Sequence, residues 1–193
     1  MQKGKTFIIS GPSGVGKSTV LKALLEKRPD LYFSVSATTR DPRPGEVDGV
    51  HYHFMDVDAF RQRIAEDAFL EYAEYVGNFY GTPKRYVDEA MNAGRDVIQG
   101  ALQVCGKRPE TVRIFISPPS WSELERRLTE RGTDSPEKIQ KRLLRAKVEF
   151  QTAHTYDYFV INDTVEDAVE ELDAIMTAEH CKPAERMEII SGR

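Results

Sequence analysis

Hydrophobic and polar positions along the chain follow two spacings, one typical of strands and one typical of helices. Short apolar runs predict buried strands at residues 6–9, 112–116 and 158–161. Apolar residues at helical spacing predict helices over residues 18–27, 120–131, 136–151 and 165–178. Because these strands and helices alternate, the pattern indicates an α/β fold with a mainly parallel sheet flanked by helices.

The stretch from residue 32 to residue 83 has a different pattern, with short strands and many turn residues. Strands are predicted at residues 32–37, 52–54 and 69–76, with a helix over about residues 56–66. The segment DPRPGEVDG at 41–49 predicts an exposed loop. Thr82 followed by Pro83 predicts the cap and first position of a further helix. Together these elements predict a small α+β insert.

Composition and charge restrict the class of protein. The 193 residues suffice for one enzyme-sized domain. With 27 basic and 31 acidic side chains, the net charge of −4 provides no global positive field for nucleic acid or an anionic membrane. No apolar run approaches the roughly 18 to 20 residues that a bilayer requires. We therefore expect a protein that binds neither nucleic acid nor membrane, and the sequence leaves its oligomeric state open. The opening segment MQKGKTFIIS lacks the apolar region of a secretory signal, so we expect a cytoplasmic location.

A glycine-rich segment lies directly between the first predicted strand and the first predicted helix. Its sequence, GPSGVGKS at 11–18, matches the phosphate-binding pattern G-x-x-x-x-G-K-[ST] in full. In such a P-loop, backbone N–H groups and the helix N-terminus face phosphate oxygens, Lys17 neutralises the β- and γ-phosphates, and Ser18 can hold Mg²⁺. The alternative, a turn with a solvated lysine, is disfavoured by the flanking strand and helix. The predicted ATP-binding residues of this loop are Gly11, Pro12, Ser13, Gly14, Val15, Gly16, Lys17, Ser18 and Thr19.

Two arginines and two tyrosines of the insert form a second candidate site. Arg40 and Arg43 stand three apart in the proline-rich loop, and Tyr52 and Tyr80 follow them. Guanidinium groups and phenol hydroxyls are donors suited to a phosphate dianion. Solvated arginines and core tyrosines are the alternative reading of the same four residues.

Glu71 is placed unusually for a carboxylate. By strand alternation it shares a face with Phe69 and Ala73, where a charged group needs a partner or a function. Guanine could supply that partner, because its N1–H and 2-amino group form a two-donor edge that one carboxylate accepts. Adenine has no such edge. A guanine base is therefore one ligand that would account for a carboxylate at this position.

The P-loop and several further segments together resemble guanylate kinase over nearly the whole chain. These segments are SVSATTRDPRPGEVDG (34–49), YHF (52–54), FLEYAEYVGNFYGT (69–82), FISPPSWSELERRLTERGTDS (115–135) and VIND (160–163). The resemblance implies Mg²⁺-dependent transfer of the γ-phosphoryl group of ATP to GMP, giving ADP and GDP, in purine nucleotide metabolism. It also implies one domain whose core is 1–33, 83–120 and 152–180, with a GMP-binding insert at 34–82 and a lid at 121–151. Residues 181–193 are expected to be a frayed tail.

The resemblance also implies roles for individual residues of the insert. Arg40, Arg43, Tyr52 and Tyr80 match positions that grip the phosphate of GMP. Glu71 matches the position that accepts from guanine, and Ser36 and Thr82 match hydroxyls that complete base recognition. For Ser36 and Thr82, an ordinary strand hydroxyl and a helix cap are the respective alternatives.

Three further arginines match the family's lid. The resemblance implies that Arg127, Arg131 and Arg142 close on the γ-phosphoryl group and, with Lys17 and Arg40, stabilise charge during transfer and expel water. Asn162 matches a segment beside the adenine of ATP, and Asp163 or Thr164 is expected to cap the last helix. The remaining basic residues of the lid helices, Arg126, Arg145 and Lys147, are expected to form a solvated face.

One strand departs from the family pattern. Residues 96–98 begin a strand that runs straight into Gln99 and Gly100, where family members carry further apolar residues and an acidic end. Asp96 cannot replace the missing acid, because it lies at the opposite end of the strand. Two or three residues at ~3.3 Å each place it about 7 to 10 Å away from the phosphates. Gln99 could orient the waters of Mg²⁺ instead, or the chain could be a weak or inactive nucleotide- or protein-binding module. A P-loop kinase for another monophosphate is a third reading, which Glu71 disfavours.

Overall fold

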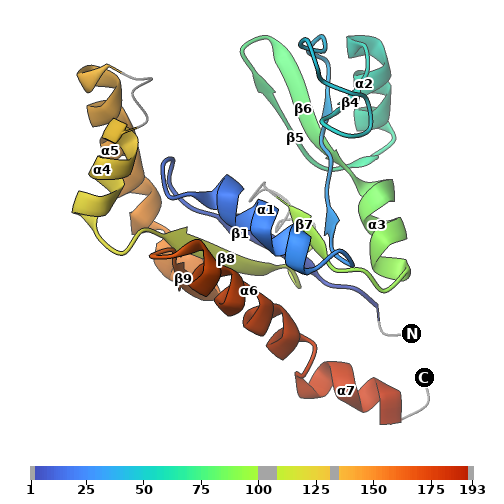
Figure 1. The fold of residues 1–193 in the computed structure, drawn as a ribbon. Helices are drawn as coiled ribbons and strands as arrows, with labels where there is room; N and C mark the ends of the chain where they lie inside the picture. The colour runs from blue at the N-terminus through green and yellow to red at the C-terminus, as the bar shows by residue number, and fades with distance from the viewer. Residues whose placement is uncertain (1–2, 100–107, 131–134, 191–193) are drawn as a thin grey trace. The chain divides into compact units, whose positions relative to one another are not determined.

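The computed structural model describes residues 3–99, 108–130 and 135–190. These residues form two compact units. The first unit contains residues 3–8 and 30–112, and the second contains residues 9–29 and 113–193. Strand β1 (Thr6–Ser10) begins in the first unit and ends in the second. Figure 1 gives the element labels.

The first unit contains three parallel strands and one helix packed on them. Strand β7 (Val97–Gln99) pairs with β1, with Ile8 opposite Gln99, and also with β2 (Tyr32–Phe33). Helix α3 (Lys84–Asn92) covers these strands through its apolar face. The cluster between them consists of Ile8, Leu70, Val87, Ala90, Met91 and Val97.

A second, four-stranded sheet of this unit has the order β4-β3-β6-β5. Its strands are β3 (Ala37–Thr38), β4 (His53–Phe54), β5 (Phe69–Tyr75) and β6 (Asn78–Pro83). Helix α2 (Val57–Ala65), capped by the Asp56 side chain, packs on it with Phe60 against Ala37 and Phe69. Strands β5 and β6 form a hairpin whose turn needs Gly77, since its φ is 74°. This sheet and its helix confirm the predicted α+β character of the segment.

The structure corrects three expectations in this unit. The strand predicted at 32–37 is two short strands, β2 and β3, that belong to different sheets. Thr82 does not cap a helix, because it pairs with Glu71 inside the β5–β6 hairpin and α3 begins at Lys84 after Pro83. Gln99 is the last residue of β7 and not a break in it.

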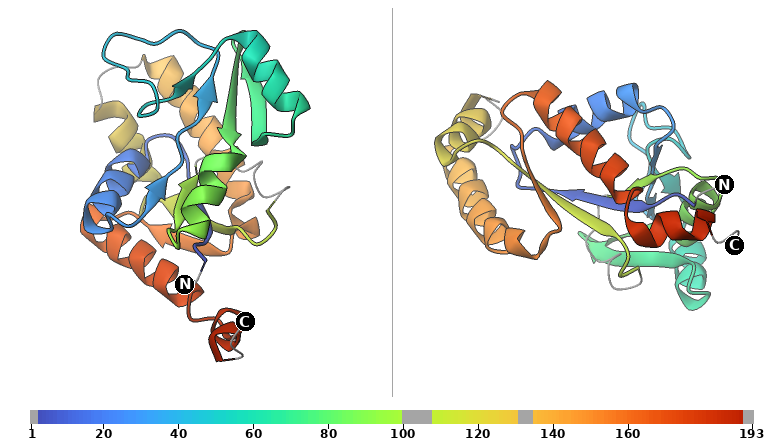
Figure 2. Two further views of the ribbon diagram at one scale, coloured as in Figure 1. Left: turned by 90° about the vertical axis from the view of Figure 1, so that its right-hand side faces the viewer. Right: turned by 90° about the horizontal axis from the view of Figure 1, so that it is seen from below.

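The second unit contains the other strands of the parallel sheet, whose full order is β2-β7-β1-β8-β9. Strand β8 (Val112–Ser117) pairs in parallel with β9 (Tyr158–Ile161), with Ser117 opposite Ile161. Helix α1 (Lys17–Lys27) lies beside α6 (Val165–Glu179), as Figures 1 and 2 show. Ion pairs from Lys27 to Glu170 and from Arg28 to Asp173 join the two helices. A parallel sheet flanked by helices is the α/β fold predicted from the sequence.

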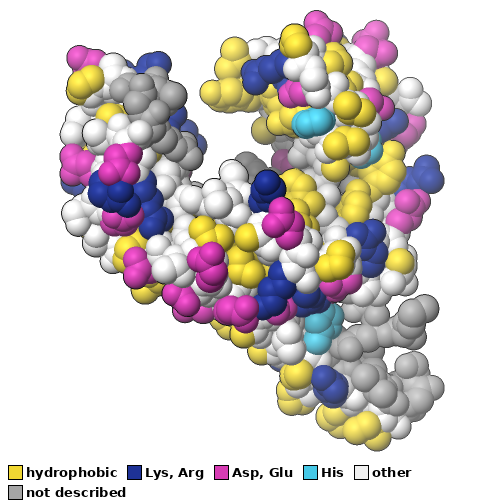
Figure 3. All heavy atoms as spheres, in the orientation of Figure 1, with side chains coloured by type: hydrophobic (Ala, Val, Ile, Leu, Met, Phe, Trp, Pro, Cys, Tyr) yellow, Lys and Arg dark blue, Asp and Glu magenta, His cyan; other side chains and the backbone are white. Residues whose placement is uncertain are grey.

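Helices α4 (Trp121–Glu130) and α5 (Pro136–Gln151) form a pair in the second unit. Leu124, Leu128 and Ala146 are buried between them. Leu144 and Val148, two apolar residues of α5, are each 61% exposed. Basic and acidic side chains alternate over the outer face of α4, as Figure 3 shows. A 3₁₀ turn at Ala153–Thr155 then leads to β9.

The C-terminal segment is helical where a frayed tail was expected. Helix α7 (Pro183–Ile190) starts with proline at its first position, where the missing N–H group is not needed. The Arg186 side chain donates to the His180 carbonyl and to the Cys181 sulfur, which ties the helix to the residues before it. None of the described helices is both long and apolar enough to cross a bilayer.

Candidate nucleotide-binding sites

The P-loop takes a conformation that only glycine suits. Gly14 and Gly16 have φ values of 96° and 88°, in the left-handed region. A Cβ atom on Gly16 would lie 2.6 Å from the Asn162 side-chain nitrogen, and one on Gly14 would lie 2.7 Å from Leu128. The loop then enters α1, where the Gly16 carbonyl accepts from Thr19 and Val20. The sequence pattern therefore corresponds to a closely packed loop at the N-terminus of a helix.

A cavity of about 540 Å³ lies over this loop. Every residue predicted in the loop lines it, from Gly11 to Thr19, together with Arg142, Arg145 and Glu149 of α5. Burial lowers the pKa of Lys17, and the negative charge of Glu149 acts in the opposite direction. A partly desolvated ammonium in a cavity with two arginines is suited to a polyphosphate.

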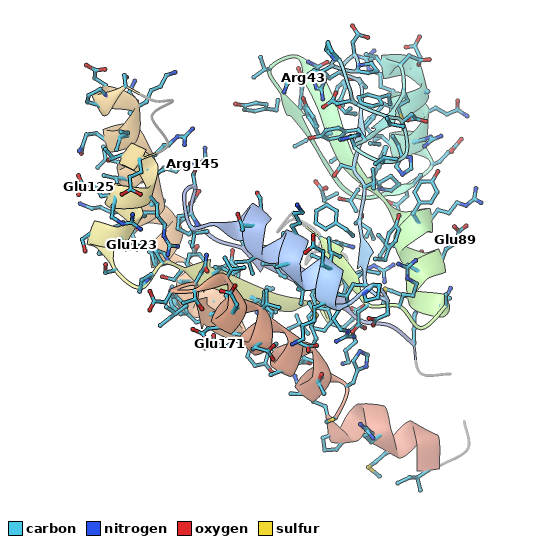
Figure 4. The ribbon with its side chains drawn as sticks, in the orientation of Figure 1. Arg43, Glu89, Glu123, Glu125, Arg145 and Glu171 are labelled. Atoms are coloured by element: carbon cyan, nitrogen blue, oxygen red, sulfur yellow. The ribbon has the colours of Figure 1, made fainter. Side chains whose placement is uncertain are left out.

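Arg145 and Glu149 were not among the residues predicted to bind ATP, and Arg145 was expected to lie on a solvated face. The Arg145 side chain, labelled in Figure 4, donates to Glu149 over 3.1 Å. The signal was available, since positions 142, 145 and 149 are three and four apart and share one face of a helix. That face contributes to the cavity, although the Arg145 side chain is 81% exposed.

Arg127 contacts the backbone of the P-loop. Its guanidinium donates to the Val15 carbonyl and the Asp163 carbonyl, each over 3.3 Å, and to Glu123 over 2.6 Å. Hydrogen bonds from Arg126 and then Arg127 lower the pKa of Glu123 to about 2. Arg131, the third predicted lid arginine, lies outside the described residues.

Asn162 braces the same loop from the end of β9. It is 3% exposed, and its side-chain amide donates to the Val15 carbonyl over 2.6 Å. Asn162 was expected beside the adenine of ATP, and its contact with the loop was not predicted. The cap of α6 is Thr164, whose hydroxyl accepts from the Asp167 N–H group, so Asp163 is not the cap.

The phosphate-site residues predicted in the insert lie together in the first unit. The Arg40 guanidinium carbon is 5.5 Å from the Tyr52 ring centre, and the Tyr52 and Tyr80 rings are 6.1 Å apart edge to face. Arg43 is exposed in the loop between β3 and β4 (Figure 4). The structure thus brings one arginine and both tyrosines into one cluster and places the second arginine on the same loop.

Glu71 and Thr82 face each other across the β5–β6 hairpin. The Thr82 hydroxyl donates to Glu71 over 2.6 Å. Burial raises the pKa of Glu71, and the Thr82 hydrogen bond lowers it in part. The β-bulge between Phe69 and Glu71 breaks the predicted alternation, so Phe69 is buried whereas Ala73 is exposed. Ser36 precedes β3, and its carbonyl accepts from the His53 N–H group.

Gln99 is the polar side chain at the carboxyl end of β7. It is 1% exposed, and within the described residues neither its amide oxygen nor its amide nitrogen has a hydrogen-bond partner. Asp96, at the other end, accepts from the Lys5 N–H group over 2.8 Å and supports the sheet there. Asp96 therefore has a structural partner of its own.

A P-loop between the first strand of a parallel sheet and its helix, under a cavity lined with cations, defines a nucleotide-binding α/β protein of the P-loop class. A family model described as "Guanylate kinase" matches residues 3–179. The chain belongs to the guanylate kinase family.

Individual relatives agree with this assignment. A guanylate kinase of Thermus thermophilus is 56% identical over 182 residues, covering 92% of this chain and 82% of that protein. One of Clostridium perfringens is 52% identical over 185 residues, covering 93% and 86%. The crystal structure of guanylate kinase from Anaplasma phagocytophilum matches with a TM-score of 0.70 at 32% identity, covering 95% of this chain and 90% of that one. Nothing in these relatives or in the described residues favours an inactive module.

Proposed function

We propose that this chain transfers the γ-phosphoryl group of ATP to GMP, giving ADP and GDP. The observation that carries the proposal is the cavity over the P-loop, which Lys17, Arg142 and Arg145 all line. Cations and backbone N–H groups around a phosphate chain stabilise the charge that develops on its oxygens. No protein nucleophile is needed, because an oxygen of the GMP phosphate attacks in line.

In the second unit, the P-loop holds the phosphates of ATP. Lys17 neutralises them, and Arg142 and Arg145 approach from α5. Arg127 and Asn162 fix the loop through the Val15 carbonyl. Arg131 keeps the lid role that the family resemblance implies.

In the first unit, Arg40, Arg43, Tyr52 and Tyr80 bind the phosphate of GMP. Glu71 accepts from N1–H and the 2-amino group of guanine, and Thr82 orients that carboxylate through its hydrogen bond. Ser36 supplies a further hydroxyl for the base.

Magnesium belongs to this proposal as the partner of ATP. The described residues contain no group of three or more His, Cys, Asp or Glu side chains that could hold a metal. Ser18 fits the ion, because this hydroxyl-bearing residue lines the cavity and Mg²⁺ prefers a few oxygen ligands beside substrate phosphates and waters. When bound, Mg²⁺ neutralises charge on the phosphates. The cytoplasmic location predicted from the sequence is also part of the proposal.

The test is an ADP-release assay with ATP, Mg²⁺ and GMP, AMP, dTMP or UMP in turn. We expect turnover with GMP that greatly exceeds turnover with the other three monophosphates. Equal rates with AMP would contradict the proposed role of Glu71. Tight binding of GMP without ADP release would contradict the reaction itself.

A further inference from the structure

Glu46 connects the two arginines of the GMP phosphate site. Both of its carboxylate oxygens accept from the terminal nitrogen Nη2 of Arg40, over 2.8 and 2.9 Å. One of them also accepts from the backbone N–H group of Arg43, over 2.7 Å. The side chains of Arg40 and Glu46 are only 16% and 17% exposed, so the pair is sheltered from solvent.

Two reciprocal hydrogen bonds between Glu46 and Arg43 fix the loop that contains them. The Glu46 N–H group donates to the Arg43 carbonyl over 3.0 Å, while its carboxylate accepts from the Arg43 N–H group. Gly45 between them has a φ of 87°, and Pro42 and Pro44 restrict the backbone further. The Arg43 N–H bond and then the Arg40 guanidinium hold the pKa of Glu46 below its usual value. The carboxylate is therefore charged wherever GMP carries a dianionic phosphate.

The contacts of Glu46 leave the Arg43 guanidinium available for a ligand. In Arg40, Nη2 donates to Glu46, Nη1 donates to the Asp41 carbonyl over 2.6 Å, and the Tyr80 side chain also interacts with the guanidinium. Glu46 engages Arg43 only through its backbone. Within the described residues, no ion pair involves the Arg43 guanidinium.

We propose that Glu46 is a positioning residue for GMP, which fixes the Arg40 side chain and the Arg43 backbone so that both guanidinium groups meet one phosphate. The inference rests on the proposed phosphate role of Arg40 and Arg43. If the Glu46 carboxylate only occupied the place of the phosphate, its hydrogen bond with the Arg43 backbone N–H group would be unexplained. Fixing donors before the ligand arrives lowers the entropy lost on binding.

Replacement Glu46→Gln tests this role, since glutamine keeps the size but removes the charge and one acceptor. We expect KM for GMP to rise on the order of tenfold, because a misplaced binding group loses much of its effect. KM for ATP should stay within about twofold. Glu46→Asp, which keeps the charge, should lose less than Glu46→Gln. Glu74→Gln, an exposed carboxylate of β5, is the matched control and should behave as the unchanged protein.

Three results would overturn the inference. An unchanged KM for GMP would mean that Glu46 positions nothing. A lower KM would make it a competitor of the phosphate. Equal rises in both KM values would indicate general damage to the fold.

Arg43→Gln separates this inference from the function on which it rests. If Arg43→Gln raises KM for GMP but Glu46→Gln does not, only the positioning role fails, whereas no effect of Arg43→Gln contradicts the phosphate site.

Discussion

Replacing Glu71 by glutamine tests how the chain selects guanine. Glutamine keeps the size of the side chain and an oxygen that can accept from Thr82, which lies 2.6 Å from the carboxylate. It removes the negative charge, and its NH₂ group is a donor that faces the donors of guanine. The change therefore alters the recognition of the base and leaves the hairpin intact.

The expected magnitude follows from the hydrogen bonds that are lost. A hydrogen bond to a charged group is worth about 1.5–3 kcal/mol, so losing one predicts a fall of roughly 10- to 150-fold in kcat/KM for GMP. KM for ATP should not change. Wild-type protein should also prefer GMP to IMP, whose base lacks the 2-amino group, and Glu71→Gln should narrow that preference.

The variant should fold. Burial raises the pKa of Glu71 above its usual value, so the folded protein binds a proton on this carboxylate more readily than the unfolded chain does. The protonated carboxyl therefore favours folding at low pH, and this contribution to stability is lost as pH rises through the raised pKa. At neutral pH the ionised carboxylate weakens folding, and glutamine removes that penalty. The midpoint of thermal unfolding at pH 7 should therefore stay the same or increase.

The assay is steady-state ADP release with GMP and ATP varied in turn, with Glu74→Gln as the control on the same strand. Equal losses for GMP and ATP would refute the role given to Glu71. An unchanged ratio of GMP to IMP turnover would refute it as well.

Three further predictions concern pH, the P-loop and α5. KM for GMP should rise as pH falls toward the raised pKa of Glu71, because the protonated acid cannot accept from both donors of guanine; a pH profile of KM that Glu71→Gln leaves unchanged would contradict this. Gly16→Ala should lower kcat/KM for ATP more than about tenfold, because the added Cβ atom would lie 2.6 Å from the Asn162 side chain. Gly77→Ala is the control and should leave ATP kinetics unaffected, because Gly77 also has a positive φ but a Cβ atom there would meet no atom within 4 Å. Arg145→Gln should lower kcat/KM for ATP about tenfold, because Arg145 lines the cavity. Arg126, which pairs with Glu123 and Glu130, is the control, and Arg126→Gln should change kcat/KM for ATP less than about twofold. Equal effects of the two replacements would contradict a role for Arg145 in binding ATP.

The sequence predicted the parts of the molecule in which chemistry and local structure coincide. The P-loop is contiguous, so its glycines, Lys17 and Ser18 identify it without any tertiary information. Strands β8 and β9 and helix α6 were predicted to within about one residue, because each is a separate apolar or amphipathic segment.

Features that depend on contacts between distant segments could not be predicted. Thr82 resembled a helix cap locally, but the hairpin with β5 determines its position. The brace from Asn162 to Val15 joins residues 147 apart in the chain, so no local pattern reports it. Glu46 is only six residues from Arg40, yet its role depends on how the loop closes around Gly45.

The most direct test of the proposed reaction follows the phosphoryl group itself. With ATP labelled at the γ-phosphate and excess GMP, we expect the label to appear in GDP in a one-to-one ratio with ADP, and Lys17→Ala to remove most of this transfer. Label recovered as inorganic phosphate, or transfer that persists in Lys17→Ala, would contradict the reaction.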